Sequence, residues 1–343
     1  MIYAQISQCY SVREIETSMR VNKNRLYHSG LKEIKRSTFC DALEKRRHEI
    51  FKSVFHAISE KAWGLGRTMK KKFAEPLRII DASIISLCLT RFDWARYRKA
   101  KGAVKLHMNL DGDSLMPVDA CLTVGKVHDV QQLLNLSQES AVIYVMDRGY
   151  VDYKLLYNIE PRGSFFVTRM KSNGAYKKTK CSPCKEGGPV LADEIIELTG
   201  PKTKQNYPKA MRKVKYYDQE KGRTFEFLTN DLGRDAEEVA AIYKERWEVE
   251  LFFKWIKQHL KIKSFWGTSE NAVYSQIWMA LIVQLLLWIN KYLEGIDKSL
   301  YEILMMIKPM LLAKGSLIGL CTNIPVSEQN IESHQLFLEG FQC

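Results

Sequence analysis

The sequence lacks an apolar run long enough to span a lipid bilayer. A membrane helix needs about 20 apolar residues, whereas the longest apolar run, from Ile277 to Ile289, is shorter and is interrupted by Gln284. A stretch of this kind is typical of a buried helix, so we expect no membrane partner. With 343 residues, 46% of them hydrophobic, the chain can form one large domain with an insertion or two modest domains.

Cysteine pairs are almost absent as well. The eight cysteines are scattered, and only Cys181 and Cys184 form a CxxC pair. A structural zinc would need a second pair or histidines at suitable spacing, and the neighbourhood offers neither. No signal peptide precedes the cysteines, and disulfides are rare in reducing compartments. We therefore expect neither zinc nor a disulfide framework, and we expect a cytoplasmic location.

Acidic residues are too few to balance the basic ones. The chain has 52 Lys and Arg against 39 Asp and Glu, a net charge of +13 with a pI near 9.2, which favours a polyanionic partner. Residues 1–72 have sixteen basic and seven acidic side chains, a net charge of +9. Apolar positions from Phe39 to Ile58 recur at helical spacing after a cap at Ser37 or Thr38. This predicts a helical DNA-recognition region; a solvated basic helix is the alternative.

A β pattern begins near Leu77. Three consecutive β-rich stretches, at 77–89, 102–112 and 115–124, predict an antiparallel meander. After a short helical stretch, a buried strand ends at Asp147, and a helix and a further strand follow. The order βββαβαβ, with acidic residues at the ends of the first and fourth strands, is that of an RNase H-like sheet. The expected fold class is α/β, with a mixed sheet flanked by helices.

The next stretch departs from that order and predicts an insertion. Gly, Pro and Lys cluster in KKTKCSPCKEGGP, and a hairpin turns between Asp218 and Gly222. The chain then divides into five expected segments: a helical DNA-recognition region at 1–72, the first part of an RNase H-like catalytic domain at 73–170, a mostly β insertion at 171–230, the catalytic helix and the last part of that domain at 231–295, and a helical region with a tail at 296–343.

Polar residues share one face of the helix expected between about Asp235 and His259. At about 100° per residue, Tyr243, Arg246, Glu250 and Lys257 fall within an arc of roughly 60° on an otherwise mostly apolar helix. Burying unpaired charge is expensive. The pattern therefore favours a groove that faces an anion, with Lys254 and Arg148 as further cations beside it.

Three carboxylates, Asp81, Asp147 and Glu250, come from two strand ends and this helix. Oxygen ligands of this kind bind Mg²⁺, and two such ions can activate an attacking oxygen and stabilise a leaving one. Each carboxylate also has a structural interpretation: Asp81 could cap a helix, Asp147 could pair with Arg148, and Glu250 could pair with Arg246 or Lys254.

The spacing of Tyr243, Arg246, Glu250 and Lys257 resembles the YREK signature of DDE transposases from one group of bacterial insertion sequences, the IS-four-type transposases. The block RWEVELFFKWIKQHLKIKSFWGTSENAV around Glu250, VMDRGYVDY around Asp147 and IIDAS around Asp81 are similar to blocks of that family. The resemblance extends from near the N-terminus to about Asn290 and is weaker in the last fifty residues.

The resemblance implies that Asp81, Asp147 and Glu250 are catalytic and coordinate two Mg²⁺ ions, for which Mn²⁺ can substitute. Tyr243, Arg246 and Lys257 would hold the phosphates of the element end. The implied activity is cleavage of double-stranded DNA at the terminal repeats of an insertion sequence and joining of the ends to target DNA. A homodimer on DNA and a nucleoid-associated cytoplasmic location are further expectations.

Two features depart from the family pattern. Some relatives hold an extruded base on a tryptophan of the β insertion, but this sequence has no tryptophan between Trp94 and Trp247. A flipped base would therefore stack on an aromatic side chain of the insertion, and the candidates are Tyr207, Tyr216, Tyr217 and Phe225. The chain is also expected to be truncated at its N-terminus relative to many relatives.

Two other functions compete with a transposase. A truncated or degenerate copy would act as a non-cleaving DNA-binding repressor of its element, and a structure-selective nuclease would cleave without joining. The three intact carboxylates favour an enzyme over a repressor. Nicked and joined products from labelled element ends distinguish all three.

Overall fold

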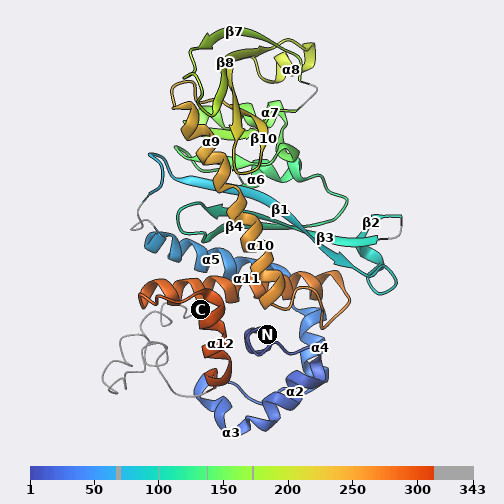
Figure 1. Cartoon of the computed structure of the whole chain (residues 1–343). Coiled ribbons are helices and arrows are strands. Elements are labelled where there is room, and N and C mark those ends of the chain that lie inside the picture. Colours follow the sequence, from blue (N-terminus) through green and yellow to red (C-terminus); the bar gives the residue numbers. More distant parts are fainter. Residues whose placement is uncertain (67–70, 100, 137, 172–173, 313–343) are drawn as a thin grey trace. The chain divides into compact units, whose positions relative to one another are not determined.

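The computed structural model describes residues 1–66, 71–99, 101–136, 138–171 and 174–312 (Figure 1). These residues form two compact units. The sheet unit comprises Ser59–Trp255, and the helical unit comprises Met1–Ile58 with the chain from Ile256 onward. Both α5 (His48–Gly66) and α10 (Trp247–His259) pass from one unit into the other.

The central strands of the sheet unit have the RNase H-like order. β1 pairs with β3 in antiparallel and with β5 in parallel orientation, β5 pairs with β6 in parallel, and β4 pairs with β3 in antiparallel. The spatial order is therefore β4-β3-β1-β5-β6, which confirms the predicted fold class. The bounds are β1 Leu77–Leu87, β3 Lys101–Asp111, β4 Pro117–Val124, β5 Ile143–Met146 and β6 Phe165–Arg169.

Continuous apolar runs explain why β1 and β5 lie in the middle of this sheet. All four residues of β5 are buried, as are the first four of β1, because strands covered on both faces need apolar side chains on both. The core beside them includes Tyr144, Tyr150, Phe166 and Tyr207, and it packs against α6 (Leu133–Leu136) and α7 (Tyr153–Tyr157).

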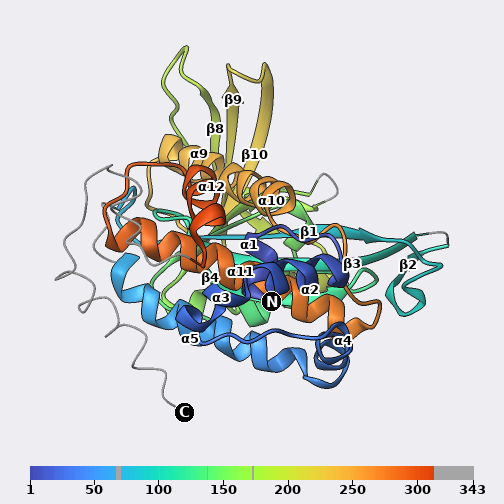
Figure 2. The same cartoon turned by 90° about the horizontal axis from the view of Figure 1, so that it is seen from below.

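The insertion is mostly β, as predicted, and its strands continue the same sheet. β10 pairs with β6, and the order runs on through β9, β8 and β7; Figure 2 shows β8, β9 and β10 side by side. The expected hairpin turn lies between Asp218 and Arg223, which face each other. The bounds are β7 Tyr176–Ser182, β8 Val190–Leu198, α8 Pro201–Asn206, β9 Met211–Asp218 and β10 Arg223–Thr229.

The helix expected between about Asp235 and His259 is interrupted. α9 (Ala236–Glu245) ends before Arg246, and α10 begins at Trp247. Around the break, the amide of Arg246 donates to the carbonyl of Tyr243 and the amide of Val249 donates to that of Arg246. These three-residue bonds tighten the backbone locally, so a uniform 100° step does not hold across Arg246.

The helical unit confirms a helical N-terminal region. Its core includes Ile15, Met19, Leu26, Phe39 and Ala272. The N-terminal helices are α1 Ile2–Ile6, α2 Val12–Val21, α3 Lys23–Leu26, α4 Arg36–Lys45 and the first part of α5, and the C-terminal ones are α11 Glu270–Leu293 and α12 Leu300–Met310. Short 3-10 turns lie at Tyr27–Ser29, Asp93–Ala95, Asp129–Gln132, Arg148–Tyr150 and Glu160–Arg162.

The long helix expected from Ser37 onward is two helices, which corrects the predicted cap. α4 already begins at Arg36, so Ser37 and Thr38 lie inside it. The side chain of Asn271 separates the helices: its amide nitrogen donates to the carbonyls of Leu43 and Arg46, both at 2.8 Å, and its oxygen accepts from the amide of His48 at 2.8 Å. These contacts satisfy backbone groups that a helix end leaves open.

Residues 1–58 share one core with the described part of the chain from Ile256 to Leu312. The boundaries expected near 72 and 295 stay predictions. In α1, the buried Gln5 donates to the carbonyls of Lys261 and Gln276 and accepts from the amide of Lys261. The role of residues 1–72 in DNA recognition stays a prediction. Of the segment expected at 296–343, only the part up to Leu312 lies within the described residues.

α11 is longer than the apolar run in the sequence. By length and composition it could cross a membrane, but 94% of its most apolar window is buried inside the protein. Its buried Gln276 donates to the carbonyls of Lys261 and Ser264. This burial is what the core helix of a folded domain shows.

Candidate active site

Asp81 and Asp147 occupy equivalent positions on neighbouring strands. The parallel pairing of β1 with β5 ends with Ile80 opposite Met146, and each aspartate is the next residue. The prediction that Asp81 lies at a strand end is wrong in one respect. β1 continues to Leu87 because it stays paired with β3. Asp81 therefore lies inside β1, at the point where the neighbouring parallel strand β5 ends.

Glu250 lies in the first turn of α10, and Arg246 connects its carboxylate with that of Asp81. Nη1 of Arg246 lies 2.9 Å from Oδ2 of Asp81, and its Nη2 lies 2.6 Å from Oε1 of Glu250. The structural alternative of an Arg246–Glu250 ion pair is therefore present, whereas the helix-cap alternative for Asp81 is wrong because the residue is in a strand.

Asp147 has two other partners. Its Oδ1 accepts from Nη2 of Arg169 at 3.2 Å and from the hydroxyl of Tyr243 at 3.4 Å. The expected alternative partner, Arg148, is exposed in the turn that follows. Tyr243 is held in place by Phe227 of β10, with ring centroids 4.9 Å apart. The insertion strand thus positions one residue of this site.

The neighbouring charges act on Asp81. Burial raises the pKa of Asp81 to about 6; Arg246 opposes the rise, and the charges of Asp147 and Glu250 add to it. Burial alone would lower the pKa of Arg246, but its hydrogen bond to Glu250 and the neighbouring negative groups raise it. Arg246 is therefore a permanent cation between Asp81 and Glu250.

The donor set fits hard divalent cations, since it consists of carboxylate oxygens. Among the described residues, no group of three His, Cys, Asp or Glu side chains is gathered as closely as a preformed metal site requires. Arg246 lies between Asp81 and Glu250 and forms an ion pair with each. Divalent ions would take the place of its guanidinium.

Two further expected cations lie on α10. Lys254 is exposed, one turn after Glu250. Lys257 follows in the part of α10 that belongs to the helical unit, and burial lowers its pKa, with a smaller effect of Lys263. The apolar residues Trp247 and Leu251 of the same helix are 51% and 45% exposed.

Arg169 is a site residue that the sequence analysis missed. It is the last residue of β6, which runs parallel to β5, so its end lies beside Asp147. The sequence offered one signal for it: a cation ends the strand that follows the Asp147 strand along the chain. Among the aromatic candidates for base stacking, Tyr207 is 1% exposed and belongs to the core, whereas Tyr217 is 39% exposed.

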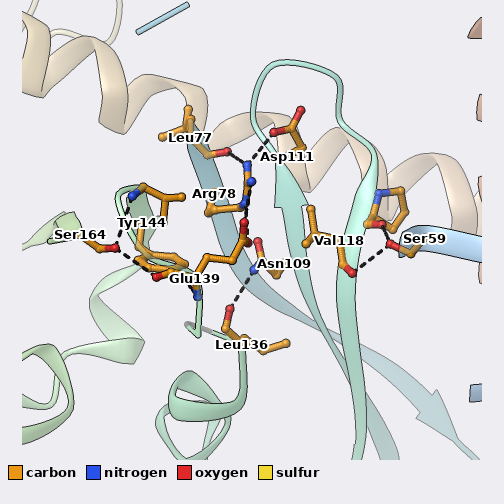
Figure 3. A network of polar contacts seen from close by, with 12 residues as sticks. Ser59, Leu77, Arg78, Asn109, Asp111, Val118, Leu136, Glu139, Tyr144 and Ser164 are labelled. Carbon is orange, nitrogen blue, oxygen red and sulfur yellow. Dashed lines mark hydrogen bonds and ion pairs between the residues drawn. The ribbon is translucent and has the colours of Figure 1, made fainter. Parts of the chain in front are cut away.

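A buried polar network supports the strand that presents Asp81 (Figure 3). Arg78 of β1 is fully buried; it donates to Asp111 at 2.6 Å and to both carboxylate oxygens of Glu139 at 2.7 and 2.8 Å. Its guanidinium also lies 4.2 Å from the ring centroid of Trp63. This pairing compensates the cost of a buried charge.

Known proteins are similar to the part of the chain that contains the three carboxylates. The family model described as Transposase DDE domain matches residues 72–286, and one described as Domain of unknown function (DUF4372) matches residues 1–32. A protein named as a transposase in Sinorhizobium fredii is 35% identical over 75% of this chain and 72% of its own length. One named as the transposase of insertion sequence element IS5377 in Geobacillus stearothermophilus is 31% identical over 75% and 68%.

Among solved structures, the piggyBac transposase synaptic complex with hairpin DNA has a TM-score of 0.48 and 12% identity, over 97% of this chain and 73% of that one. A likeness of this size carries no argument. The family match alone covers more than half of the sequence and includes all three carboxylates. The chain belongs to the DDE transposases, a family of metal-dependent enzymes that cut and join DNA.

Proposed function

We propose that this chain binds the terminal repeats of an insertion sequence, cleaves the DNA at the element ends and joins them to target DNA. Asp81, Asp147 and Glu250 would hold two Mg²⁺ ions, with Mn²⁺ as a substitute. One observation carries the proposal: Arg246 contacts the carboxylates of Asp81 and Glu250, and Asp147 follows the strand that pairs in parallel with β1. All three carboxylates lie within the segment that matches the DDE domain.

The proposed chemistry assigns a separate task to each group. Bound divalent ions would activate the attacking oxygen and stabilise the leaving oxygen of the phosphodiester. Asp81 and Glu250 would supply oxygens that hold them once Arg246 releases its contacts, and Asp147 would supply a third ligand from the end of the neighbouring parallel strand. Arg246 then pairs with a phosphate of the DNA, because a guanidinium fits phosphate as well as carboxylate.

Unsatisfied donors support a phosphate at this position. The Nε atoms of Arg246 and Arg169 are buried and have no acceptor among the described residues. A buried donor without a partner costs on the order of 1 to 3 kcal/mol, and phosphate oxygens between these two arginines would satisfy both. Tyr243 and Lys257 are proposed as further DNA contacts in line with the YREK signature. Lys254 and Arg148 are proposed as additional cations that contact the DNA.

The remaining parts of the proposal concern assembly and location. Joining two element ends favours a homodimer on DNA, and the basic N-terminal segment 1–72 favours contact with the terminal repeats. A cytoplasmic, nucleoid-associated protein fits a DNA substrate. A non-cleaving repressor is less well supported, because it would not need Asp81, Asp147 and Glu250 together.

Labelled duplexes that end in the element's terminal repeats test the proposal. Incubation with Mg²⁺ and an unlabelled target should produce nicked ends first and joined products later, and an unrelated duplex of equal length should remain uncut. Joined products separate a transposase from a nuclease. Specific binding without any nick, in Mg²⁺ and in Mn²⁺, would overturn the proposal in favour of a repressor.

A further inference from the structure

A basic pocket lies at the other end of β1 from the carboxylates. Beyond Leu87, the chain turns back through β2 (Arg96–Arg98), which pairs with the start of β3 (Figure 1). Here a cavity of about 440 Å³ is lined by Arg96, Arg98, Lys99 and Lys126, with Tyr97 and Asp93 among the other residues.

The charges of this basic pocket are unbalanced. Arg96, Arg98, Lys99 and Lys126 are exposed, and Asp93 is the only acidic residue in the lining. No ion pair among the described residues involves any of the four cations. Four like charges around one concavity repel one another, and an anion placed among them would relieve that repulsion.

Two glycines show that the basic pocket is built by close packing. A Cβ on Gly125 would lie 2.8 Å from ring atoms of Tyr97, so the turn that presents Lys126 rests directly against that ring. A Cβ on Gly102 would lie 3.1 Å from the carbonyl oxygen of Leu87 and 3.3 Å from that of Ala95. Three chain segments are therefore held together around the cations.

The separation from the carboxylates suits a duplex. From Asp81 to Leu87 the strand advances six residues, or about 20 Å at 3.3 Å per residue, which is less than one turn of B-DNA at about 34 Å. A single duplex can therefore contact both places. A small anion would fill little of an open cavity this size, whereas a phosphate backbone runs past it.

We propose that the basic pocket formed by Arg96, Arg98, Lys99 and Lys126 binds the phosphate backbone of duplex DNA at a distance from the cleaved bond. It would act as a second anchor that orients the DNA over the sheet. This inference rests on the proposed function, and it assigns DNA contacts to a segment outside both residues 1–72 and α10. Phosphate contacts of this kind carry no sequence information.

Equilibrium binding of the full chain over a series of salt concentrations tests the inference. The basic-pocket variant combines Arg96→Ala, Lys99→Ala and Lys126→Ala. The matched control combines Lys154→Ala, Lys202→Ala and Lys204→Ala, which remove three equally exposed charges from α7 and α8. A third variant keeps the charges, with Arg96→Lys, Lys99→Arg and Lys126→Arg.

The slope of log affinity against log salt is negative, and its magnitude should decrease by about two to three units in the basic-pocket variant, since each phosphate contact contributes about 0.9. The control should lose less than one unit, and the charge-keeping variant should match the wild type. Equal slopes for the basic-pocket variant and the control would overturn the inference. Single Lys126→Ala, with an expected loss of about one unit, keeps the test valid if the triple variant folds poorly.

Two probes identify which DNA the basic pocket holds. One is a duplex with an element end and its flank, and the other is an unrelated duplex offered to protein already bound to element ends. A slope change on the first assigns the pocket to end DNA, and a change on the second assigns it to target DNA. A wild-type chain that binds neither probe would overturn this inference together with the proposed function, whereas normal wild-type binding with unchanged variant slopes overturns the inference alone.

Discussion

Arg246 lies 2.9 Å from Asp81, measured from Nη1 to Oδ2, although 165 residues separate them in the chain. The same guanidinium contacts Glu250 through its other terminal nitrogen. One arginine therefore occupies the space between two of the carboxylates proposed to bind metal. If divalent ions bind there as proposed, their binding is coupled to the release of Arg246, because the ions and the guanidinium compete for the same oxygens.

Replacing Arg246 with Ala should raise the affinity for Mn²⁺ by about 10- to 100-fold, since a charge-assisted hydrogen bond that competes with the ion contributes roughly 1.5 to 3 kcal/mol. Isothermal titration without DNA measures this. Arg148→Ala, which removes an exposed arginine beside Asp147, is the control and should leave the affinity unchanged. A lower affinity in Arg246→Ala would show that the arginine preorganises the carboxylates instead of competing for them.

Glu250→Gln keeps the size of the side chain and removes its charge, so cleavage and joining should both collapse while folding and DNA binding persist. If Glu250 is only the ion-pair partner of Arg246, the variant should lose at most about 0.5 kcal/mol of stability and retain its activity. Strand cleavage and thermal unfolding are measured on the same sample. Glu248→Gln on the same helix is the control, and full cleavage by Glu250→Gln would refute the metal-ligand assignment.

Lys257→Ala should flatten the salt dependence of binding to element ends by about one unit, because one phosphate contact is removed. Affinity for Mn²⁺ without DNA should not change. Lys202→Ala, an exposed lysine on α8, provides the charge-matched control. A slope equal to that of the control would assign Lys257 to a structural role in its own helix.

Arg78→Ala should destabilise the protein by about 3 to 5 kcal/mol, because it leaves Asp111 buried without its cation. Denaturant unfolding measures the change. The double variant Arg78→Ala, Asp111→Ala should be clearly less destabilised than the sum of the two single variants. Strict additivity would mean that Arg78 and Asp111, both shown in Figure 3, do not stabilise the protein through their mutual contact.

His107 should make folding sensitive to mild acid. Burial lowers its pKa to about 4 from the usual 6.5, with Asp129 opposing and Lys105 adding to the shift. Between these pH values the unfolded chain binds one more proton than the folded one. The free energy of unfolding therefore decreases as the pH is lowered, by up to about 1.4 kcal/mol per pH unit. His107→Gln should show a smaller loss between pH 6.5 and 4 in denaturant titrations. Parallel curves for both proteins would contradict this.

The residue pattern alone was sufficient for the fold class and for the identity of the candidate groups. Buried strands read as apolar runs, and the aspartates after Ile80 and Met146 could be recognised because parallel strands present their carboxyl ends at one edge. The helical N-terminal region followed from the spacing of apolar residues. Each of these features is local in the sequence, or is a pairing that the strand order implies.

The contacts within the site were not readable in this way. Helical periodicity placed Arg246 and Glu250 on one face, but it could not show that the helix breaks at Arg246 or that its guanidinium reaches Asp81. The partner of Asp147 was expected next to it in sequence and is instead Arg169. Such choices depend on which side chain is nearest after folding, and sequence distance carries no information about that.

The sequence by itself determined which segments are helical or extended, the order of the central strands and the chemical character of the residues in the site. The tertiary structure alone decided the grouping of residues 1–58 with the chain from Ile256, the continuation of the sheet through β10 to β7, and the basic pocket at the end of β1. The physical reason is that periodicity records which face of an element is buried, whereas the packing of distant segments depends on shape and charge that meet only in the folded chain.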